Sequence, residues 1–162
     1  MDRDERATSA EALTAASGAL LAIAVRSVAA GPVDLTVAQH RVLVLVESHE
    51  VLSVNDVAEQ LGVDQSNASR HCSRLAGLGL VTRTRARHDG RAVDVQLTPA
   101  GRRQVEAVRD ARRTEIRRVL DRMSDRSVRE AVRGFTTFDE AADAIARDSL
   151  QRPAAYATGK SK

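Results

Sequence analysis

Aromatic side chains are nearly absent from this sequence of 162 residues. It has no Trp, one Tyr and two Phe, so aromatic residues make up 2% of the chain. The apolar share of 43% is that of an ordinary soluble domain, and its core must be built from Ala, Val, Leu and Ile. Proteins that bind RNA or single-stranded DNA usually need aromatic platforms on which bases stack. The composition therefore argues against that class of protein.

Cysteine and long apolar runs are also scarce. Cys72 is the single cysteine, so no intrachain disulfide can form, and a reducing compartment is the simple interpretation. No apolar run approaches the ~20 residues that span a bilayer. The N-terminus, MDRDERATSAEAL, is charged and acidic, unlike a secretory signal. We expect a cytoplasmic protein with no membrane partner.

Motifs for catalysis and for metal binding are missing as well. The sequence has no nucleophile elbow, no H-E-x-x-H pair and no glycine loop that would cradle a phosphate. His71 and Cys72 are adjacent, and adjacent helical residues diverge by about 100°, so they cannot easily hold one metal ion. Cys72 is either a redox sensor or a small buried residue, and its place on an apolar stripe favours the second interpretation. We expect no catalytic residue, no metal site and no cofactor.

Positive charge is concentrated in the middle of the chain. The net charge is +3, but residues 1–63 carry four Arg against nine acidic residues, a balance of −5. Residues 64–118 carry thirteen Arg against six acidic residues, a balance of +7. This segregation favours a polyanionic partner for the central segment, although a solvated basic helix surface would give the same pattern.

Helical periodicity describes the first part of the chain. We predict an Ala-rich helix over residues 10–30, ended by Gly31 and Pro32, and a second helix that opens with a capping box of Thr36 and Gln39. The first helix carries small apolar residues that suit close packing, within the chain or in a dimer: Leu13, Ala16, Leu20 and Ile23 or Ala24. The second helix has its own apolar side: Val42, Leu43 and Val46.

Two short helices in series follow. Ser53 and Asp56 can cap the first, Gly62 ends it, and Asp64 can cap the second. In the second, Ala68, Cys72 and Leu75 form one apolar stripe. A short helix, a tight turn and a helix with a polar outer surface form a helix-turn-helix, whose second helix enters the major groove of DNA. Its outer side chains are of types that bond base edges and phosphates: Gln65, Ser66, Asn67, Ser69, Arg70, Ser73 and Arg74.

A basic hairpin comes next. Strand patterns over residues 80–85 and 92–97 flank ARHDGR, where Gly90 can supply a positive φ. Thr98 as N-cap and Pro99 at the first helical position then begin another helix. A basic hairpin directly after a recognition helix is typical of a wing, whose arginines enter the minor groove where negative potential is concentrated.

The remainder is predicted to be helical. A long helix covers residues 99–123, Ser124 caps a last helix, and the tail over 151–162 is expected to be mobile. The apolar side of the long helix consists of Val105, Val108, Ile116, Val119, Leu120 and Met123. In the last helix we expect four residues to pack: Phe135, Phe138, Ala142 and Ile145.

Taken together, three segments resemble the MarR family of bacterial winged-helix regulators in order and spacing: LTVAQHRVLVLV, VAEQLGVDQSNASRHCSRLAGLGLVTR and DGRAVDVQLTPAG. The resemblance covers roughly residues 35–105. It implies a mainly α fold with a small β-wing, in a single domain over residues 1–162. A winged helix-turn-helix lobe over 35–104 would join a dimerisation platform made of the helices over 10–34 and 105–150. It also implies an obligate homodimer that binds a pseudo-palindrome in double-stranded DNA, most often as a repressor.

The resemblance assigns roles to individual residues. Arg91 matches the wing-tip arginine that enters the minor groove, and Arg87 and His88 would lie beside phosphates. Asp89 would brace the wing by accepting a hydrogen bond from Arg83 or Arg91. In the recognition helix, the residues that match the groove-facing positions are Gln65, Ser66, Asn67, Ser69, Arg70 and Arg74.

Two histidines depart from the family pattern. His71 stands where Leu is usual, and His40 stands where an aromatic or aliphatic residue is usual. His40 lies near the place where the family binds effectors, so it could hydrogen-bond a small aromatic or carboxylic effector. A core histidine with satisfied hydrogen bonds is the alternative, which we favour.

Winged helices also serve as protein-interaction modules, which would be a second class of function. Such a module is expected to present an apolar groove or patch. Here the exposed helix surface is polar and cationic, which favours duplex DNA.

Overall fold

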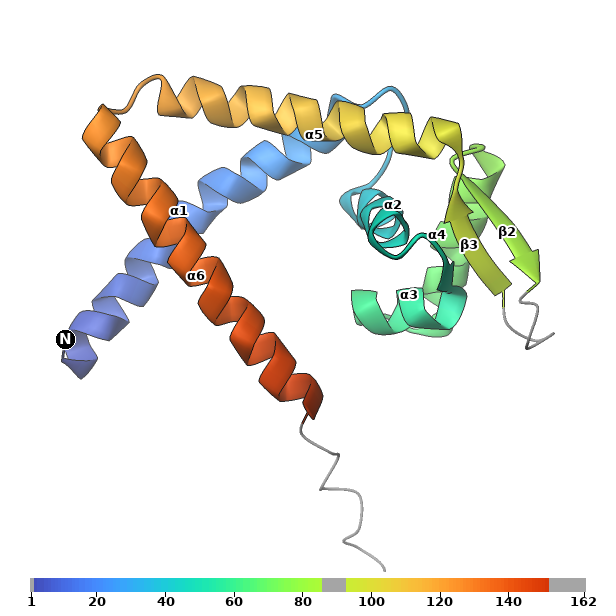
Figure 1. The fold of residues 1–162 in the computed structure, drawn as a ribbon, viewed down its shortest axis with the longest axis horizontal. Coiled ribbons are helices and arrows are strands. Elements are labelled where there is room, and N and C mark those ends of the chain that lie inside the picture. Colours follow the sequence, from blue (N-terminus) through green and yellow to red (C-terminus); the bar gives the residue numbers. More distant parts are fainter. Residues whose placement is uncertain (1, 86–92, 152–162) are drawn as a thin grey trace, which may run out of the picture. The chain divides into compact units, whose positions relative to one another are not determined.

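The computed structural model describes residues 2–85 and 93–151, with side chains up to residue 145. By contacts it divides into two compact units, residues 1–117 and residues 118–162. The described chain is mainly helical with one small sheet, which confirms the predicted fold class (Figure 1). Its elements in chain order are α1 (Arg3–Ala29), α2 (Val37–His49), β1 (Leu52–Ser53), α3 (Val54–Leu61), α4 (Gln65–Gly77), β2 (Val81–Arg85), β3 (Val93–Leu97), α5 (Pro99–Leu120) and α6 (Asp125–Gln151).

The helix starts follow local side-chain chemistry, as predicted. The Thr36 hydroxyl accepts from the Gln39 amide N–H at 3.2 Å, and the Gln39 side chain accepts from the Thr36 N–H at 3.0 Å. Ser53 and Asp56 form the same reciprocal box at the start of α3. α3 ends at Gly62, whose φ of +66° is a conformation that glycine adopts without strain. These caps confirm the boundaries of the helix-turn-helix.

α1 begins earlier than predicted and is unusually apolar. It starts at Arg3 rather than near residue 10, because Asp2 and Glu5 form a capping box that was not anticipated. Between Arg6 and Arg26 the only charged residue is Glu11. By length and composition α1 is the one described helix that is long and apolar enough to cross a membrane, a test that helices of soluble proteins also pass. Ser, Thr and Gly interrupt its apolar run without making it polar.

The wing strands belong to a three-stranded antiparallel sheet in the order β1-β3-β2. β2 pairs with β3 so that Val81 lies opposite Leu97 and Arg85 opposite Val93, which confirms the predicted hairpin strands. β1 adds Leu52 opposite Val95. This third strand was not predicted, because two residues carry no alternation pattern and their pairing is set by the fold.

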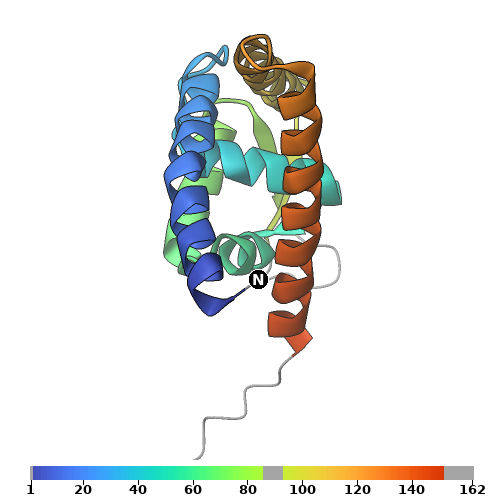
Figure 2. The same ribbon diagram turned by 90° about the vertical axis from the view of Figure 1, so that its left-hand side faces the viewer.

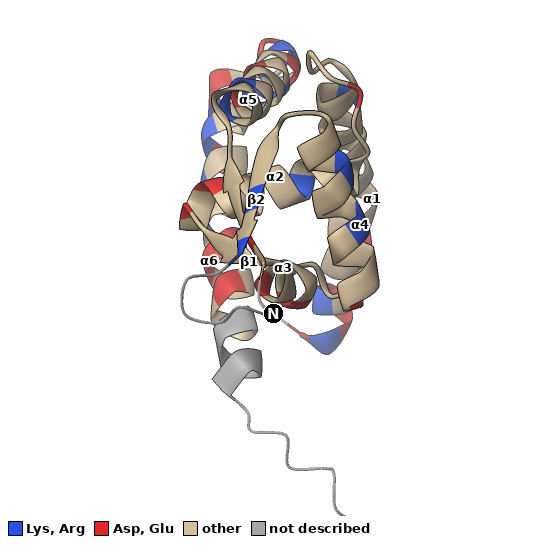
Figure 3. Cartoon of the chain, turned by 90° about the vertical axis from the view of Figure 1, so that its right-hand side faces the viewer, with Lys and Arg blue, Asp and Glu red and all other residues tan. Residues whose placement is uncertain are grey.

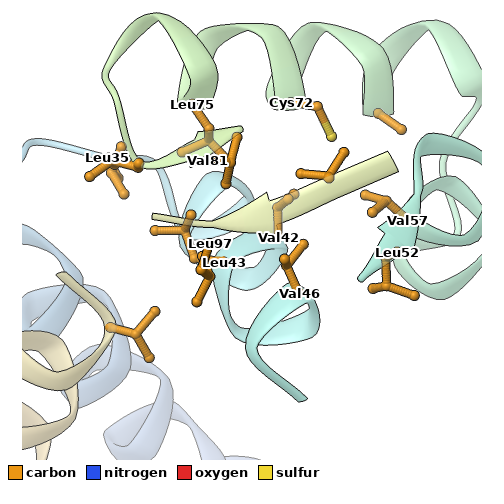
Figure 4. Close-up of a cluster of buried hydrophobic side chains, with 14 of the residues drawn as sticks. Leu35, Val42, Leu43, Val46, Leu52, Val57, Cys72, Leu75, Val81 and Leu97 are labelled. Carbon is orange, nitrogen blue, oxygen red and sulfur yellow. The ribbon is translucent and has the colours of Figure 1, made fainter. Parts of the chain in front are cut away.

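The core of the first unit is aliphatic, as the composition required. It lies between α2, α3, α4 and the sheet (Figure 4). The predicted stripe on α4 is confirmed, since Ala68, Cys72 and Leu75 are fully buried. α2 and α3 contribute further fully buried residues: Val42, Leu43, Val46 and Val57.

Gln104 of α5 joins this core to the segment that follows α1. Its buried side-chain amide accepts from the Val33 N–H and donates to the Val33 carbonyl, both at 2.9 Å. Gly31 lies so close that an added Cβ would be 2.4 Å from Gln104 Nε2. The segment between α1 and α2 is therefore fixed against α5.

The large apolar residues of α6 are exposed in the single chain. Phe135 is 49% exposed, Phe138 58% and Ile145 68%. On α5, Val105 and Val108 are buried as expected, but Val119 is 48% exposed. Figure 2 shows α1 and α6 each as one continuous helix. Helical periodicity identifies an apolar surface but not what covers it, so the packing of these residues stays a prediction.

Glu50, at the end of α2, has a strained backbone. Its φ of +61° is the one positive value at a non-glycine residue in the described chain, and the Val51 N–H donates to the His49 carbonyl at 2.6 Å across it. This is a γ-turn of positive φ, a strained conformation for a residue with a Cβ.

We expect Glu50→Gly to raise the free energy of unfolding by about 1 kcal/mol, because glycine adopts positive φ without a steric penalty. Urea denaturation measures the change. The matched control is Glu59→Gly in the exposed surface of α3, where loss of helix propensity should lower the same quantity by about 1 kcal/mol. Equal effects of both substitutions would contradict the γ-turn.

Candidate nucleic-acid interface

α4 presents three different side-chain stripes, each at the i, i+3 or i+4, i+7 spacing that puts residues on one side of a helix. The first is the buried stripe already described. The second, which we call the serine stripe, consists of Ser66, Ser69 and Ser73. The third, which we call the arginine stripe, consists of Asn67, Arg70 and Arg74. Arg70 and Arg74 are exposed and Asn67 is half-buried, so this stripe is available to a partner.

The first turn of the arginine stripe is held in a hydrogen-bond network. Asp64, the predicted N-cap, accepts from the Asn67 N–H at 2.8 Å and from the Asn67 side-chain amide at 2.6 Å. Arg70 donates to the Asn67 side-chain oxygen. Hydrogen bonds from the Ser66 hydroxyl and from the Asn67 backbone lower the pKa of Asp64 below its usual value. Asp64 therefore stays ionised at neutral pH and fixes the orientation of Asn67.

Arg83 of β2 joins the wing sheet to the serine stripe. It is half-buried, and its Nη1 donates to the Ser73 hydroxyl. Its Nε is buried and has no hydrogen-bond partner in the described part of the chain. Arg83 thus contacts the recognition helix, a contact that was not predicted. Its predicted partner Asp89 lies outside the described residues, as do Arg87, His88 and Arg91, so the roles of these four residues stay predictions.

A hollow of about 270 Å³ separates the serine stripe from the sheet. Ser53 and Asn55 line it, although neither had been predicted as a site residue, and Asn55 also accepts a hydrogen bond of 2.7 Å from the Gln65 side chain. In the sequence, Ser53 and Asn55 appear only as polar residues at the start of a helix-turn-helix. Polar residues are so common at helix starts that this pattern does not predict a site. The described residues that line it are Ser53, Val54, Asn55, Gln65, Ser66, Ser69, Arg83 and Val93.

The surface formed by α4 and β2 is purely basic. These two elements carry Arg70, Arg74, Arg83 and Arg85 and contain no Asp or Glu. Figure 3 shows the basic residues on α4 and β2, whereas α5 carries both signs of charge. On α5 several arginines are paired with carboxylates, for example Arg113 with Asp110 at 2.9 Å. On α4 and β2, therefore, positive charge is not offset by acidic residues of the same elements, whereas on α5 part of it is neutralised.

His40 lies apart from this surface, on α2 facing α5. It is buried, as a core histidine would be, but its Nδ1 has no hydrogen-bond partner among the described residues, so the satisfied-core interpretation does not describe it. Burial is the main cause that lowers its pKa, followed by the positive charges of Arg112 and Arg109. Arg109 donates to Glu47 at 2.6 Å. Arg112 has a buried Nε that also lacks a partner within the described chain.

Cys72 has the surroundings of a structural residue. Its side chain is fully buried, and burial raises the pKa of its thiol. Reactive cysteines are exposed and have a lowered pKa. The structure therefore supports the interpretation of Cys72 as a small core residue.

Comparison with known proteins matches both the sequence and the fold. The model of the MarR family matches residues 33–92. Two regulators of Bacillus subtilis are similar: the uncharacterized HTH-type transcriptional regulator YfiV is 29% identical over 108 residues, 67% of this chain and 68% of its own. The HTH-type transcriptional repressor MdtR is 27% identical over 118 residues, 73% of this chain and 76% of its own. The crystal structure of Rv1404 from Mycobacterium tuberculosis has a TM-score of 0.76 and 33% identity, covering 87% of this chain and 94% of that one.

Proposed function

The chain belongs to the MarR family of winged helix-turn-helix, DNA-binding transcription regulators, and on this premise we propose that it is a homodimeric repressor of a pseudo-palindromic operator. Its relatives and its fold are those of regulators, not of enzymes. The observation that carries the proposal is the exposed arginine stripe of α4 beside a basic wing strand. Neither α4 nor β2 contains an acidic residue, so the positive charge of their arginines is suited to bind the phosphates along the grooves of a DNA duplex.

The arginine stripe supplies the base-reading chemistry. Arg bonds the O6 and N7 edge of guanine, and Asn bonds the N6 and N7 edge of adenine. The network of Asp64, Asn67 and Arg70 restricts these side chains before binding, which reduces the entropy lost in the complex. In the wing, Arg91 would enter the minor groove, Arg87 and His88 would lie beside phosphates, and Asp89 would brace the hairpin.

Homodimerisation is proposed from the uncovered apolar residues of the first and last helices. Soluble monomers rarely expose large apolar patches. α1 exposes Leu13, Leu20, Leu21 and Val25, and α6 exposes Val132, Phe135 and Phe138. We assign a second copy of the chain as their cover, which gives α1 a protein partner rather than a lipid one and is consistent with a cytoplasmic protein. Two recognition helices related by the dimer axis would then meet major grooves about ten base pairs apart.

The first test is binding of the purified protein to its own upstream intergenic DNA, beside a scrambled duplex and across a salt series. We expect the upstream DNA to be preferred by roughly 10³-fold or more. Arg74→Ala should lower that preference roughly 10- to 100-fold, because each base contact discriminates by about 1–3 kcal/mol. The control, Arg103→Ala on the exposed surface of α5, should preserve the preference. Equal binding to both duplexes by the wild type would contradict a specific repressor.

A small anionic effector is proposed at His40. The buried Nδ1 of His40 and the buried Nε of Arg112 both lack partners within the described residues, whereas Arg109 is already paired with Glu47. A carboxylate of the effector could accept hydrogen bonds from His40 Nδ1 and from Arg112 Nε. His40 can donate from Nδ1 either as the neutral tautomer that carries its hydrogen there or as the protonated ring. Binding that favours a dimer with a different half-site spacing would release the operator.

The lowered pKa of His40 predicts a pH dependence of stability. The unfolded chain takes up the proton near the ordinary value of 6.5, and the folded chain only at lower pH. The free energy of unfolding is therefore highest above pH 6.5 and falls as the pH drops from there through the lowered pKa. His40→Gln should flatten this fall in urea denaturation between pH 5 and pH 8. The control Ser48→Ala changes an exposed residue of the same helix that carries no titratable group, and it should keep the wild-type profile.

A further inference from the structure

The hollow between α4 and the wing sheet has the chemistry of an anion site. Its lining offers the hydroxyl of Ser69, the side-chain amides of Asn55 and Gln65, and the guanidinium of Arg83. The hydroxyls of Ser53 and Ser66 also line it, but they already donate to Asp56 and Asp64. None of the described residues that line it is Asp or Glu. Hydroxyl, amide and guanidinium groups all donate hydrogen bonds, and phosphate oxygens accept them.

The positive charge in this hollow is fixed in position. Arg83 Nη1 is held by the Ser73 hydroxyl, so the guanidinium cannot swing freely into solvent. Its Nε is buried without a partner, and no carboxylate of the described chain is paired with it. A half-buried, oriented and unneutralised guanidinium is favourable for a bound anion, because the cost of ordering it is already met.

The serine stripe and the arginine stripe point to different surroundings. Ser66 and Ser69 line the hollow together with Gln65, whereas none of Asn67, Arg70 and Arg74 lines it. The two stripes are displaced by one residue along α4, which is about 100° around the helix. If the arginine stripe contacts the base edges in the major groove, the serine stripe faces the sugar-phosphate backbone of one DNA strand at the edge of that groove.

We propose that the hollow holds one phosphodiester group of the DNA backbone, with Arg83 and Ser69 as donors. Base reading by α4 is thereby confined to the arginine stripe, and the serine stripe, together with Gln65, positions the helix without reading sequence. This inference rests on the proposed binding of duplex DNA. DNA backbone is the occupant favoured here because Gln65 and Ser66 are exposed beside the recognition surface.

The salt dependence of DNA binding measures the contact directly. Each phosphate contact contributes about 0.9 to the slope of log K against log salt, so a dimer of Arg83→Gln should lose about 1.8. The affinity should fall roughly tenfold per site and equally for operator and scrambled duplex, because a phosphate contact carries no sequence information. Arg113→Gln is the matched control: it removes the same charge from α5, where the arginine is already paired, and should leave the slope unchanged.

Ser69→Ala distinguishes loss of the phosphate contact from loss of folding, because it leaves the hydrogen bond between Arg83 and Ser73 intact. It should lower affinity for both duplexes several-fold without lowering the thermal unfolding midpoint. An unchanged slope in Arg83→Gln, or a loss confined to the operator, would overturn the proposal.

A neutral methylphosphonate placed in turn at each backbone position of the operator locates the phosphate. The wild type should lose affinity when the methylphosphonate stands at one position in each half-site. The affinity of Arg83→Gln should not change with the substitution at that position. If instead inorganic phosphate stabilises the free protein through Arg83 and no such position exists, the hollow is a site for free anions and the proposal is wrong. A wild type that binds DNA without sequence preference would contradict the repressor function but would still allow the phosphate contact to be measured.

Discussion

Gly101→Ala is expected to lower the free energy of unfolding by about 3 kcal/mol, the upper range for a methyl group forced into a packed site. A Cβ at this position would lie 2.1 Å from the Leu80 carbonyl oxygen and 3.1 Å from its carbonyl carbon. Both are backbone atoms, which cannot rotate away as a side chain does. The substitution would therefore push the start of α5 away from the strand that leads into the wing.

The surrounding hydrogen bonds show why this contact is so close. The Thr98 hydroxyl accepts from the Gly101 N–H at 3.0 Å as the cap of α5, and donates to the Gly79 carbonyl at 2.7 Å. The Thr98 N–H donates to the Leu80 carbonyl at 3.1 Å. These bonds hold the first turn of α5 against Gly79 and Leu80, the residues that connect α4 to β2. Relief of the clash would break them, so the cost cannot be escaped by a small shift.

Urea denaturation of Gly101→Ala beside Gly77→Ala tests this argument. An added Cβ at Gly77, the last residue of α4, meets nothing within 4 Å, so alanine there should be neutral or stabilise by up to about 1 kcal/mol. If Gly101→Ala were as stable as the wild type, the packing of α5 on Leu80 would be wrong.

The double substitution Phe135→Glu with Phe138→Glu is expected to convert the protein to a monomer and to weaken operator binding roughly 10²- to 10⁴-fold. Joining two half-site readers makes the second contact intramolecular, and the loss of that linkage removes its effective concentration. Two carboxylates on the apolar surface of α6 would have to be desolvated in the interface, which opposes association. Both Phe residues are about half exposed in the single chain, so their replacement should not disturb its own core.

Light scattering gives the mass of the variant, and fluorescence anisotropy gives its affinity for the operator. Arg133→Glu is the matched control, since it changes the net charge by the same two units at an exposed position of α6. It should stay dimeric and bind the operator. A dimeric double variant with wild-type affinity would place the dimer interface elsewhere.

Local chemistry determined much of this protein. The caps at Thr36, Ser53 and Asp64, the left-handed end at Gly62 and the two main wing strands all follow from residues within one helical turn or one hairpin. The buried stripe of α4 follows from the same periodicity. These signals act over a few residues, so they survive in the sequence, and with the basic wing they were sufficient for the family resemblance.

Other features depended on segments that are distant in the chain. β1 pairs with β3 across more than forty residues, Gln104 holds Val33, and Arg83 contacts Ser73. No pattern in the sequence announces such pairs, because each depends on how two separately formed elements pack. The same holds for Gly101, whose role is a close approach to Leu80 that no turn rule requires.

The sequence by itself thus determined where α2, α3 and α4 start, which residues of the recognition helix are buried, and that the central segment is basic. Only the tertiary structure decided which polar side chains share the hollow beside the wing, and that the buried Nδ1 of His40 has no partner among the described residues. The physical reason is the range of the interactions. Capping and periodicity are settled within a turn of helix, whereas cavities, orphaned donors and uncovered surfaces exist only after distant elements have packed together.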